Sequence, residues 1–298
     1  MFCSPLPSCR DTAKAHMLTH SFCHLPRIGN VTERKIWEAG IPSWKEARNN
    51  GGRYPKLFSK AALETLEESE DRLDNGEAAW FAEHLPRNET WRLCSHFADR
   101  AAFVDIETTS GPGPVHITTI ALYDGERLRT YVHGRNLEAF GDDIREYSLL
   151  VTFNGRCFDA PIIQRELRAP LPEAHVDLRF VLRSLGMKGG LKSCEKQMGL
   201  GRNDLEGLDG YFAVLLWHEY QATGDERALE TLLAYNAADV LSMPVLLAHA
   251  YEAKLRETPF FTAQPPRPEI PENPHQACPE IIHRIRKRFG LRFLPKMR

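Results

Sequence analysis

Two carboxylates stand close together in an apolar run that has the pattern of a β-strand, FVDIETT at residues 103–109. Alternate side chains of a strand share a face, so Asp105 and Glu107 are expected to point the same way and to hold one divalent cation. Two later segments each bring one more acid next to apolar sequence: Asp159 ends FNGRCFD, and Asp239 lies in YNAADV. Four carboxylates of this kind suggest a nuclease that uses two metal ions.

The chemistry that needs such a set is hydrolysis of a phosphodiester. A water must lose a proton near neutral pH while charge grows on the phosphoryl centre and on the leaving oxygen, and two cations about 4 Å apart serve both needs. Mg²⁺ and Mn²⁺ prefer hard oxygen ligands, which Asp and Glu supply. Tyr235 lies four residues before Asp239, hence on the same face of a predicted helix, where its phenol can hydrogen-bond the attacking water.

The sequence patterns of the segments that position these acids predict a mixed sheet. Apolar alternation and turn residues predict an antiparallel meander of three strands, at 101–107, 115–123 and 128–133. A fourth strand is expected at the short apolar run 149–153, and a fifth at 174–178.

Helical periodicity fills the rest of this region. Helices are predicted at 137–147, 160–167, 180–185, 191–197, 211–220 and 229–253. Three strands, then helix, strand, helix, strand and helices is an order that predicts an α/β fold with a five-stranded sheet and helices on both faces.

With these motifs in order, the sequence resembles the DEDD 3′–5′ exonucleases, which have the RNase H-like fold. DIETT at 105–109 looks like their first motif, the segment from Asn154 to Asp159 looks like the second, and Tyr235 to Asp239 looks like the third in its tyrosine form. The second motif is most similar to the proofreading domain of family B DNA polymerases, and the whole arrangement is closest to the stand-alone YprB-like proteins. The resemblance covers about half of the chain, residues 101–253.

This resemblance implies a role for each acid. Asp105, Glu107 and Asp239 would bind the metal ion on the nucleophile side. Asp105 and Asp159 would bind the second ion, and Tyr235 would position the water. The ions would be two Mg²⁺ or Mn²⁺, and the activity would be 3′–5′ exonuclease on single-stranded ends of DNA or RNA.

Four residues near the acids are candidates for binding nucleic acid. Thr108 and Thr109 can offer hydroxyl or backbone donors to the terminal nucleotide, and Asn154 can hydrogen-bond the strand. Gly155 permits a close approach of backbone. The alternative for all four is turn formation and strand capping. Asp177, at another predicted strand end, is interpreted as structural.

The chain divides into four predicted regions. Residues 1–16 are expected to be a disordered extension, and residues 17–98 a helical N-terminal region with a helix-hairpin-helix-like turn at LPRIG, 25–29. That turn has Arg27 where the hairpin usually has glycine, so it either binds phosphates through its backbone or is a plain packing unit. The RNase H-like exonuclease domain is expected at 99–256. A Pro-rich linker and basic tail follow at 257–298. The tail is either a solvated helix end or disordered tail, or it contacts phosphates.

Composition agrees with an ordinary globular protein, with 42% hydrophobic and 26% charged residues. Seven cysteines without CxxC spacing predict reduced thiols, with Cys3, Cys9 and Cys23 as an alternative metal site. We find no apolar run of membrane-spanning length and no signal-like start, and therefore expect a cytoplasmic protein without a membrane partner. The sequence identifies no protein partner.

Two rival interpretations of function stay open. A structure-specific endonuclease would use the same metal site, since that site does not by itself define end recognition. A catalytically idle nucleic-acid-binding module would keep the fold, although the presence of all four acids and Tyr235 speaks against it. The sequence does not distinguish DNA from RNA.

Overall fold

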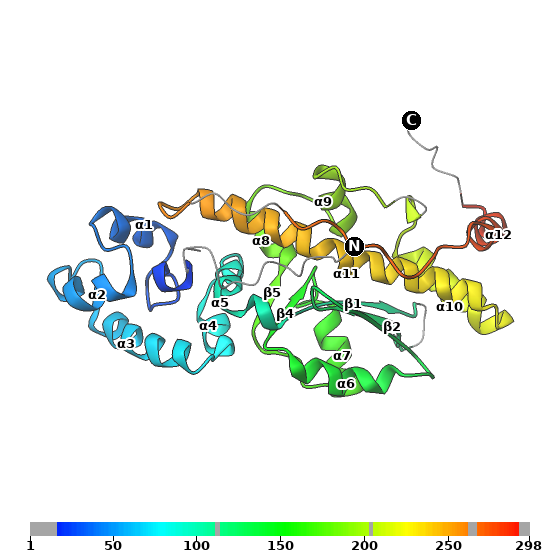
Figure 1. Ribbon diagram of the computed structural model, residues 1–298, viewed down its shortest axis with the longest axis horizontal. Helices are drawn as coiled ribbons and strands as arrows, with labels where there is room; N and C mark the ends of the chain where they lie inside the picture. Colours follow the sequence, from blue (N-terminus) through cyan, green and yellow to red (C-terminus); the bar gives the residue numbers. More distant parts are fainter. Residues whose placement is uncertain (1–16, 111–113, 203–204, 262–266, 292–298) are drawn as a thin grey trace.

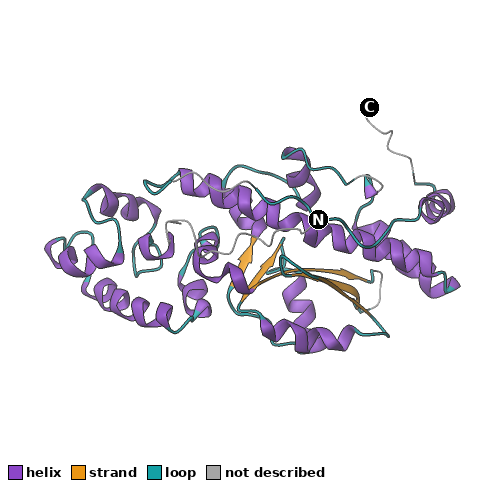
Figure 2. Ribbon diagram, viewed as in Figure 1, coloured by secondary structure: helices purple, strands orange, loops and turns teal. Residues whose placement is uncertain are grey.

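The computed structural model of the chain describes residues 17–110, 114–202, 205–261 and 267–291. The predicted extension at 1–16 lies outside these ranges. A helical N-terminal unit stands beside the sheet, and one long helix runs from that unit across the whole molecule (Figure 1). Strands form a small central part, and helices surround it (Figure 2).

The sheet has five strands in the order β3-β2-β1-β4-β5. Their bounds are β1 (Ala101–Thr108), β2 (Ile117–Tyr123), β3 (Leu128–Val132), β4 (Leu149–Thr152) and β5 (His175–Asp177). Strands β1, β2 and β3 pair antiparallel, while β4 is parallel to both β1 and β5. The predicted mixed sheet, a meander plus parallel strands, is confirmed, and β1 lies at its centre.

Helices cover both faces of this sheet. On one face lie α6 (Phe140–Asp143) and α7 (Asp159–Leu167), and on the other lie α8 (Leu178–Ser184), α9 (Leu191–Gln197), α10 (Gly210–Thr223) and α11 (Glu226–Arg256) (Figure 1). The helical stretch predicted at 137–147 is confirmed, but only its central turn, α6, is α-helical, between 3₁₀ turns at Leu137–Ala139 and Ile144–Glu146. Gly141, Asp142 and Asp143 lower helix propensity there, and Tyr131 Oη donates to Asp143 Oδ2 at 2.6 Å.

Strand β1 alternates between two apolar cores. Ala102, Val104 and Ile106 pack with residues of α6 and α7. Ala101 and Phe103 pack into the core on the opposite face, which includes residues of α11. Because side chains alternate along a strand, the next two odd-numbered residues, both acidic, also face α11.

Helix α11 is the central core helix. It has 31 residues, and Asp225 caps its first turn by accepting from Arg227 N–H. By length and composition it could cross a membrane, which the sequence inspection did not detect, but 89% of its apolar window is buried inside the fold. The apolar character of α11 therefore serves packing between the sheet, α10 and the N-terminal unit.

The N-terminal unit consists of short helices. These are α1 (Asn30–Glu38), α2 (Trp44–Asn50), α3 (Lys60–Asp74), α4 (Ala78–His84) and α5 (Cys94–Phe97), with 3₁₀ turns at Met17–His20, Gly51–Arg53, Thr90–Leu93 and Ala98–Arg100. Its buried side chains and those of the α11 face of the sheet belong to one continuous apolar cluster.

A buried ion network lies inside this unit. Arg92 pairs with Glu33 at 2.8 Å and with Glu89 at 2.9 Å, and all three side chains are at most 3% exposed. Glu33 also accepts the backbone N–H of Phe22 at 2.6 Å. Lys254, near the end of α11, lies 3.5 Å from Glu89 and so ties the long helix to the network.

The hairpin-like turn at 25–29 is packed against this unit. Arg27 adopts the left-handed conformation, with φ 65°, where a glycine would fit without strain. Leu25 and Ile28, on either side, are 3% and 5% exposed. Their burial supports the packing interpretation of the turn.

The basic C-terminal segment forms a helix, α12 (Pro279–Phe289). Ile281, Ile282 and Ile285 are buried in a cluster with residues of α10 and α11, and burial of one such side chain contributes about 2 kcal/mol. Arg284 and Arg288 pair with Glu219 of α10 at 2.9 and 3.1 Å. These charges thus hold the helix in place, and the remaining tail at 292–298 lies outside the described residues.

Candidate active site

Three predicted carboxylates meet where β1 passes α11. One oxygen each from Asp105, Glu107 and Asp239 lie within 4.8 Å of one another. The first two project from the same face of β1, and the third comes from the middle of α11. The alternation of side chains along β1 therefore turns Asp105 and Glu107 toward Asp239, which follows Glu107 by 132 residues in the sequence.

Asp159 reaches the same place from the start of α7. Its Oδ1 accepts the backbone N–H of Ile106 at 3.1 Å, between the two acids of β1. Its carboxylate is 5% exposed. All four predicted acids are thus brought together at one end of the sheet.

Asp177, at the end of β5, holds the loop before α7 in place. Its carboxylate is fully buried and accepts backbone N–H groups of Asn154 at 2.7 Å, Arg156 at 3.2 Å and Arg179 at 3.1 Å. These bonds fix the turn that delivers Asp159. Asp177 is therefore structural, as the sequence suggested.

The predicted nucleic-acid-binding residues make local contacts in this loop and in the β1–β2 hairpin. Gly155 is needed because a Cβ there would lie 2.4 Å from Thr152 Oγ1, so the close approach is to the chain itself. Asn154 has φ 68°, and its side chain accepts from Arg179. Thr109 pairs with His116 across the hairpin, donating its backbone N–H at 2.8 Å, while Thr108 ends β1 after a bulge.

Electrostatic strain within the acid cluster is large. Burial, and next the charge of Asp239, raise the pKa of both Asp105 and Glu107 well above their usual ranges. Burial raises the pKa of Asp159 to about 7 and also raises that of Asp239. Like charges in a low-dielectric site disfavour full ionisation.

Two cations from the α9 region offset part of this charge. Arg202, in the loop after α9, forms an ion pair with Asp239, and its Nε and Nη2 donate to the two oxygens of Glu195 at 2.6 Å each. Lys192 of α9 donates to the phenol oxygen of Tyr235 and to Leu208 O. Burial lowers the pKa of Lys192.

Tyr235 lies one helical turn before Asp239, as the sequence predicted, and is 3% exposed. Lys192 Nζ stands 3.9 Å from the centre of its ring. Burial, and next the charge of Asp239, raise the pKa of Tyr235 far above its ordinary value. The phenol therefore keeps its proton and can act as a hydrogen-bond donor.

Sequence reasoning missed Asn236, which is fully buried beside the cluster. Its Nδ2 donates to Asp105 Oδ2 at 2.8 Å, and its Oδ1 accepts from Thr119 Oγ1 on β2 at 3.0 Å. The amide thus fixes the orientation of Asp105. The only signal in the sequence is its place directly after Tyr235.

The donor set fits a divalent cation of the Mg²⁺ or Mn²⁺ class. It consists of hard carboxylate oxygens, and three of them converge within 4.8 Å. Their raised pKa values reflect a repulsion that a bound cation would relieve.

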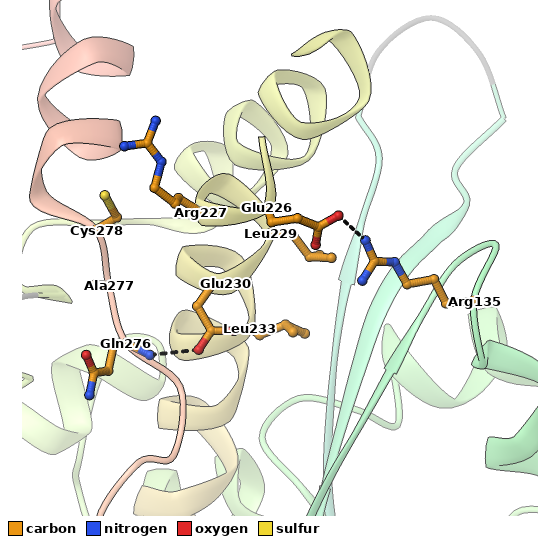
Figure 3. A pocket seen from close by; sticks show the side chains of 9 residues that line it. All are labelled: Arg135, Glu226, Arg227, Leu229, Glu230, Leu233, Gln276, Ala277 and Cys278. Atoms are coloured by element: carbon orange, nitrogen blue, oxygen red, sulfur yellow. Dashed lines mark hydrogen bonds and ion pairs between the residues drawn. The ribbon is translucent and has the colours of Figure 1, made fainter. Parts of the chain in front are cut away.

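A separate hollow of about 510 Å³ lies beside the beginning of α11 and the chain that leads into α12 (Figure 3). Leu229 and Leu233 form its apolar part. Arg135 pairs with Glu226 at 2.6 Å, and Glu230 accepts Gln276 N–H at 3.2 Å. None of the clustered acids lines this hollow, and its charged groups hold neighbouring segments together.

The fold and the acid cluster define an α/β protein of the RNase H-like class. The family model described as the RNase H superfamily matches residues 102–251, half of the chain. The chain belongs to this superfamily.

A relative and two solved structures are similar to the chain. The uncharacterized protein YprB of Bacillus subtilis is 31% identical over 179 residues, which are 52% of this chain and only 43% of YprB. A family B DNA polymerase from Pyrobaculum calidifontis superposes with a TM-score of 0.39 and 19% identity over 51% of this chain and 25% of the polymerase. The Nibbler EXO domain of Aedes aegypti superposes with a TM-score of 0.39 and 12% identity over 56% of this chain and 85% of the domain.

Proposed function

We propose that this protein is a metal-dependent nuclease that removes nucleotides from the 3′ end of single-stranded DNA or RNA. The observation that carries the proposal is the meeting of Asp105, Glu107 and Asp239 within 4.8 Å, with Asp159 hydrogen-bonded to the strand between the first two. Membership of the RNase H superfamily supports the nuclease class. The direction of digestion rests on the resemblance of the three motifs to 3′–5′ exonucleases.

In this proposal the four carboxylates hold two ions of Mg²⁺ or Mn²⁺. Such ions supply a hydroxide at neutral pH and stabilise the charge on the leaving oxygen. Asn236 keeps the Asp105 carboxylate in place through the 2.8 Å hydrogen bond.

Tyr235 is proposed to orient the attacking water. Its oxygen accepts from Lys192, which leaves the phenolic proton to donate toward the acids. Because burial raises the pKa of Tyr235, the side chain stays a donor across the working pH range. It positions water and does not act as the base.

The test is a time course on 5′-labelled single-stranded DNA and RNA with Mg²⁺, Mn²⁺ or EDTA. We expect a metal-dependent ladder that shortens from the 3′ end, and its loss in Asp105→Ala. Asp142→Ala, a matched change at an acid of α6 whose side chain is 83% exposed, should cleave like the wild type.

Other outcomes contradict parts of the proposal. Discrete internal cuts would favour a structure-specific endonuclease. Binding of either polymer without cleavage would favour a catalytically idle binding module. The polymer that is shortened identifies the substrate.

A further inference from the structure

Arg202 is held in a geometry that leaves one nitrogen for the acid cluster. Its Nε and Nη2 make a two-pronged pair with Glu195 at 2.6 Å each, and Glu195 is 2% exposed. A planar guanidinium bound in this way keeps its remaining nitrogen in a fixed direction. That nitrogen, Nη1, meets Oδ1 of Asp239.

The other acids of the cluster lack such a partner. Within the described residues, Asp105, Glu107 and Asp159 form no ion pair, although Lys192 lies close enough to lower the pKa of Glu107 in opposition to burial. Asp239 alone carries a bound positive group where a divalent cation would need a carboxylate ligand. A cation and Nη1 would therefore compete for the same carboxylate.

We propose that Arg202 is the resting counter-ion of this site: it neutralises Asp239 while no divalent cation is bound, and Glu195 retains it beside the cation when the cation takes Asp239. Its Nη1, no longer paired with Asp239, then donates to a phosphate oxygen of the substrate. This inference rests on the proposed nuclease function. Arg202 would then interact with a carboxylate in the resting protein and with a phosphate during the reaction.

A guanidinium can bind both a carboxylate and a phosphate. Its planar donors match the oxygens of carboxylates and of phosphates, and it keeps its charge at any working pH. Glu195 prevents Arg202 from leaving the site, because both side chains are largely buried, at 2% and 9% exposed. Glu195 thereby acts as a positioning residue.

The first test measures cation binding by the full chain, with Mn²⁺ titrations followed by electron paramagnetic resonance. We expect Arg202→Gln to bind Mn²⁺ at least about tenfold more tightly than the wild type, because a competing positive charge is removed. Arg227→Gln is the control: Arg227 lies on helix α11, as Asp239 does, but its side chain is 60% exposed and paired with Asp225. This change removes one positive charge elsewhere and should leave the Mn²⁺ affinity unchanged.

A second comparison keeps the test valid if Arg202→Gln alone fails to fold. Arg202→Gln alone leaves Glu195 buried without its partner, which is destabilising. The double variant Glu195→Gln with Arg202→Gln removes both charges and is compared with Glu195→Gln alone. Arg202 is then the sole difference, and the double variant should again bind Mn²⁺ about tenfold more tightly.

The second readout is binding of a 5′-fluorescein oligothymidylate, measured by anisotropy at saturating Mn²⁺ in an Asp159→Asn background. Adding Arg202→Gln should weaken DNA binding about fivefold to tenfold, opposite in sign to its effect on Mn²⁺. An arginine that only supports the fold would weaken both.

Each remaining outcome is decisive. Unchanged or weaker Mn²⁺ binding in both Arg202 comparisons overturns the counter-ion role and leaves the proposed nuclease intact. Absence of Mn²⁺ binding in the wild type overturns the counter-ion role and the proposed function together.

Discussion

The sharpest prediction concerns Asp159→Asn, a change that removes one charge and little else. The amide oxygen can still accept the Ile106 N–H that Asp159 Oδ1 accepts at 3.1 Å. Burial raises the pKa of Asp159 from 3.8 to about 7. The folded protein therefore binds a proton that the unfolded chain releases between these two values, and its stability falls as the pH rises through that window.

The size of the effect follows from this difference. At about 1.4 kcal/mol per pH unit, ionised Asp159 costs the metal-free folded state about 4 kcal/mol at pH 8, where both states have lost the proton. At pH 5 the folded state keeps the proton, and the cost is only about 2 kcal/mol. Asparagine does not titrate, so Asp159→Asn should raise the free energy of unfolding by up to these amounts.

Urea denaturation in EDTA, followed by tryptophan fluorescence at pH 8 and pH 5, measures both values. The exposed change Asp142→Asn is the control and should shift stability by less than about 0.5 kcal/mol at either pH. An Asp159→Asn protein that is less stable than the wild type at pH 8, or equally stabilised at both pH values, would refute the reasoning.

Three further predictions address neighbouring groups. Tyr235→Phe should retain Mn²⁺ affinity but lower the single-turnover cleavage rate by about 10²-fold or more; full activity would remove the phenol from the mechanism. Asn236→Leu should lower cleavage about tenfold or more, because Asp105 loses its 2.8 Å donor, and thermal melting with and without Mn²⁺ separates this from unfolding. Arg92→Leu should cost about 3–5 kcal/mol in urea denaturation, because it leaves buried Glu33 without an ion-pair partner and Glu89 with Lys254 alone; a loss below about 1 kcal/mol would contradict the network.

Much of the sheet could be predicted because its strands have strong local patterns. The run around Val104 is apolar on both sides of the acids, and Leu149 to Val151 is apolar throughout. These strands are buried on both faces. The stretch at 137–147 could be predicted as helical, but not its division into one α-helical turn between two 3₁₀ turns. Its middle is polar, and Tyr131 makes a tertiary hydrogen bond to Asp143 there.

The candidate site was predictable where one element carries the information. Asp105 and Glu107 share a face of one strand, and Tyr235 and Asp239 share a face of one helix. The contacts of Arg202 and Asn236 depend instead on loops and strands that meet only in the folded chain, at Glu195 and Thr119. No spacing rule connects such residues, so only the structure shows them.

One continuous apolar cluster runs from the N-terminal helices to the sheet, and it determines whether the RNase H-like part can fold without the N-terminal unit. Cutting the chain between residues 98 and 99 would remove Trp91 from Tyr251 of α11, whose ring centres lie 5.3 Å apart, and would release Lys254 from Glu89. The RNase H-like part is therefore not expected to fold on its own in this protein. Calorimetry of the full chain should give a single melting transition, because both parts share one apolar core.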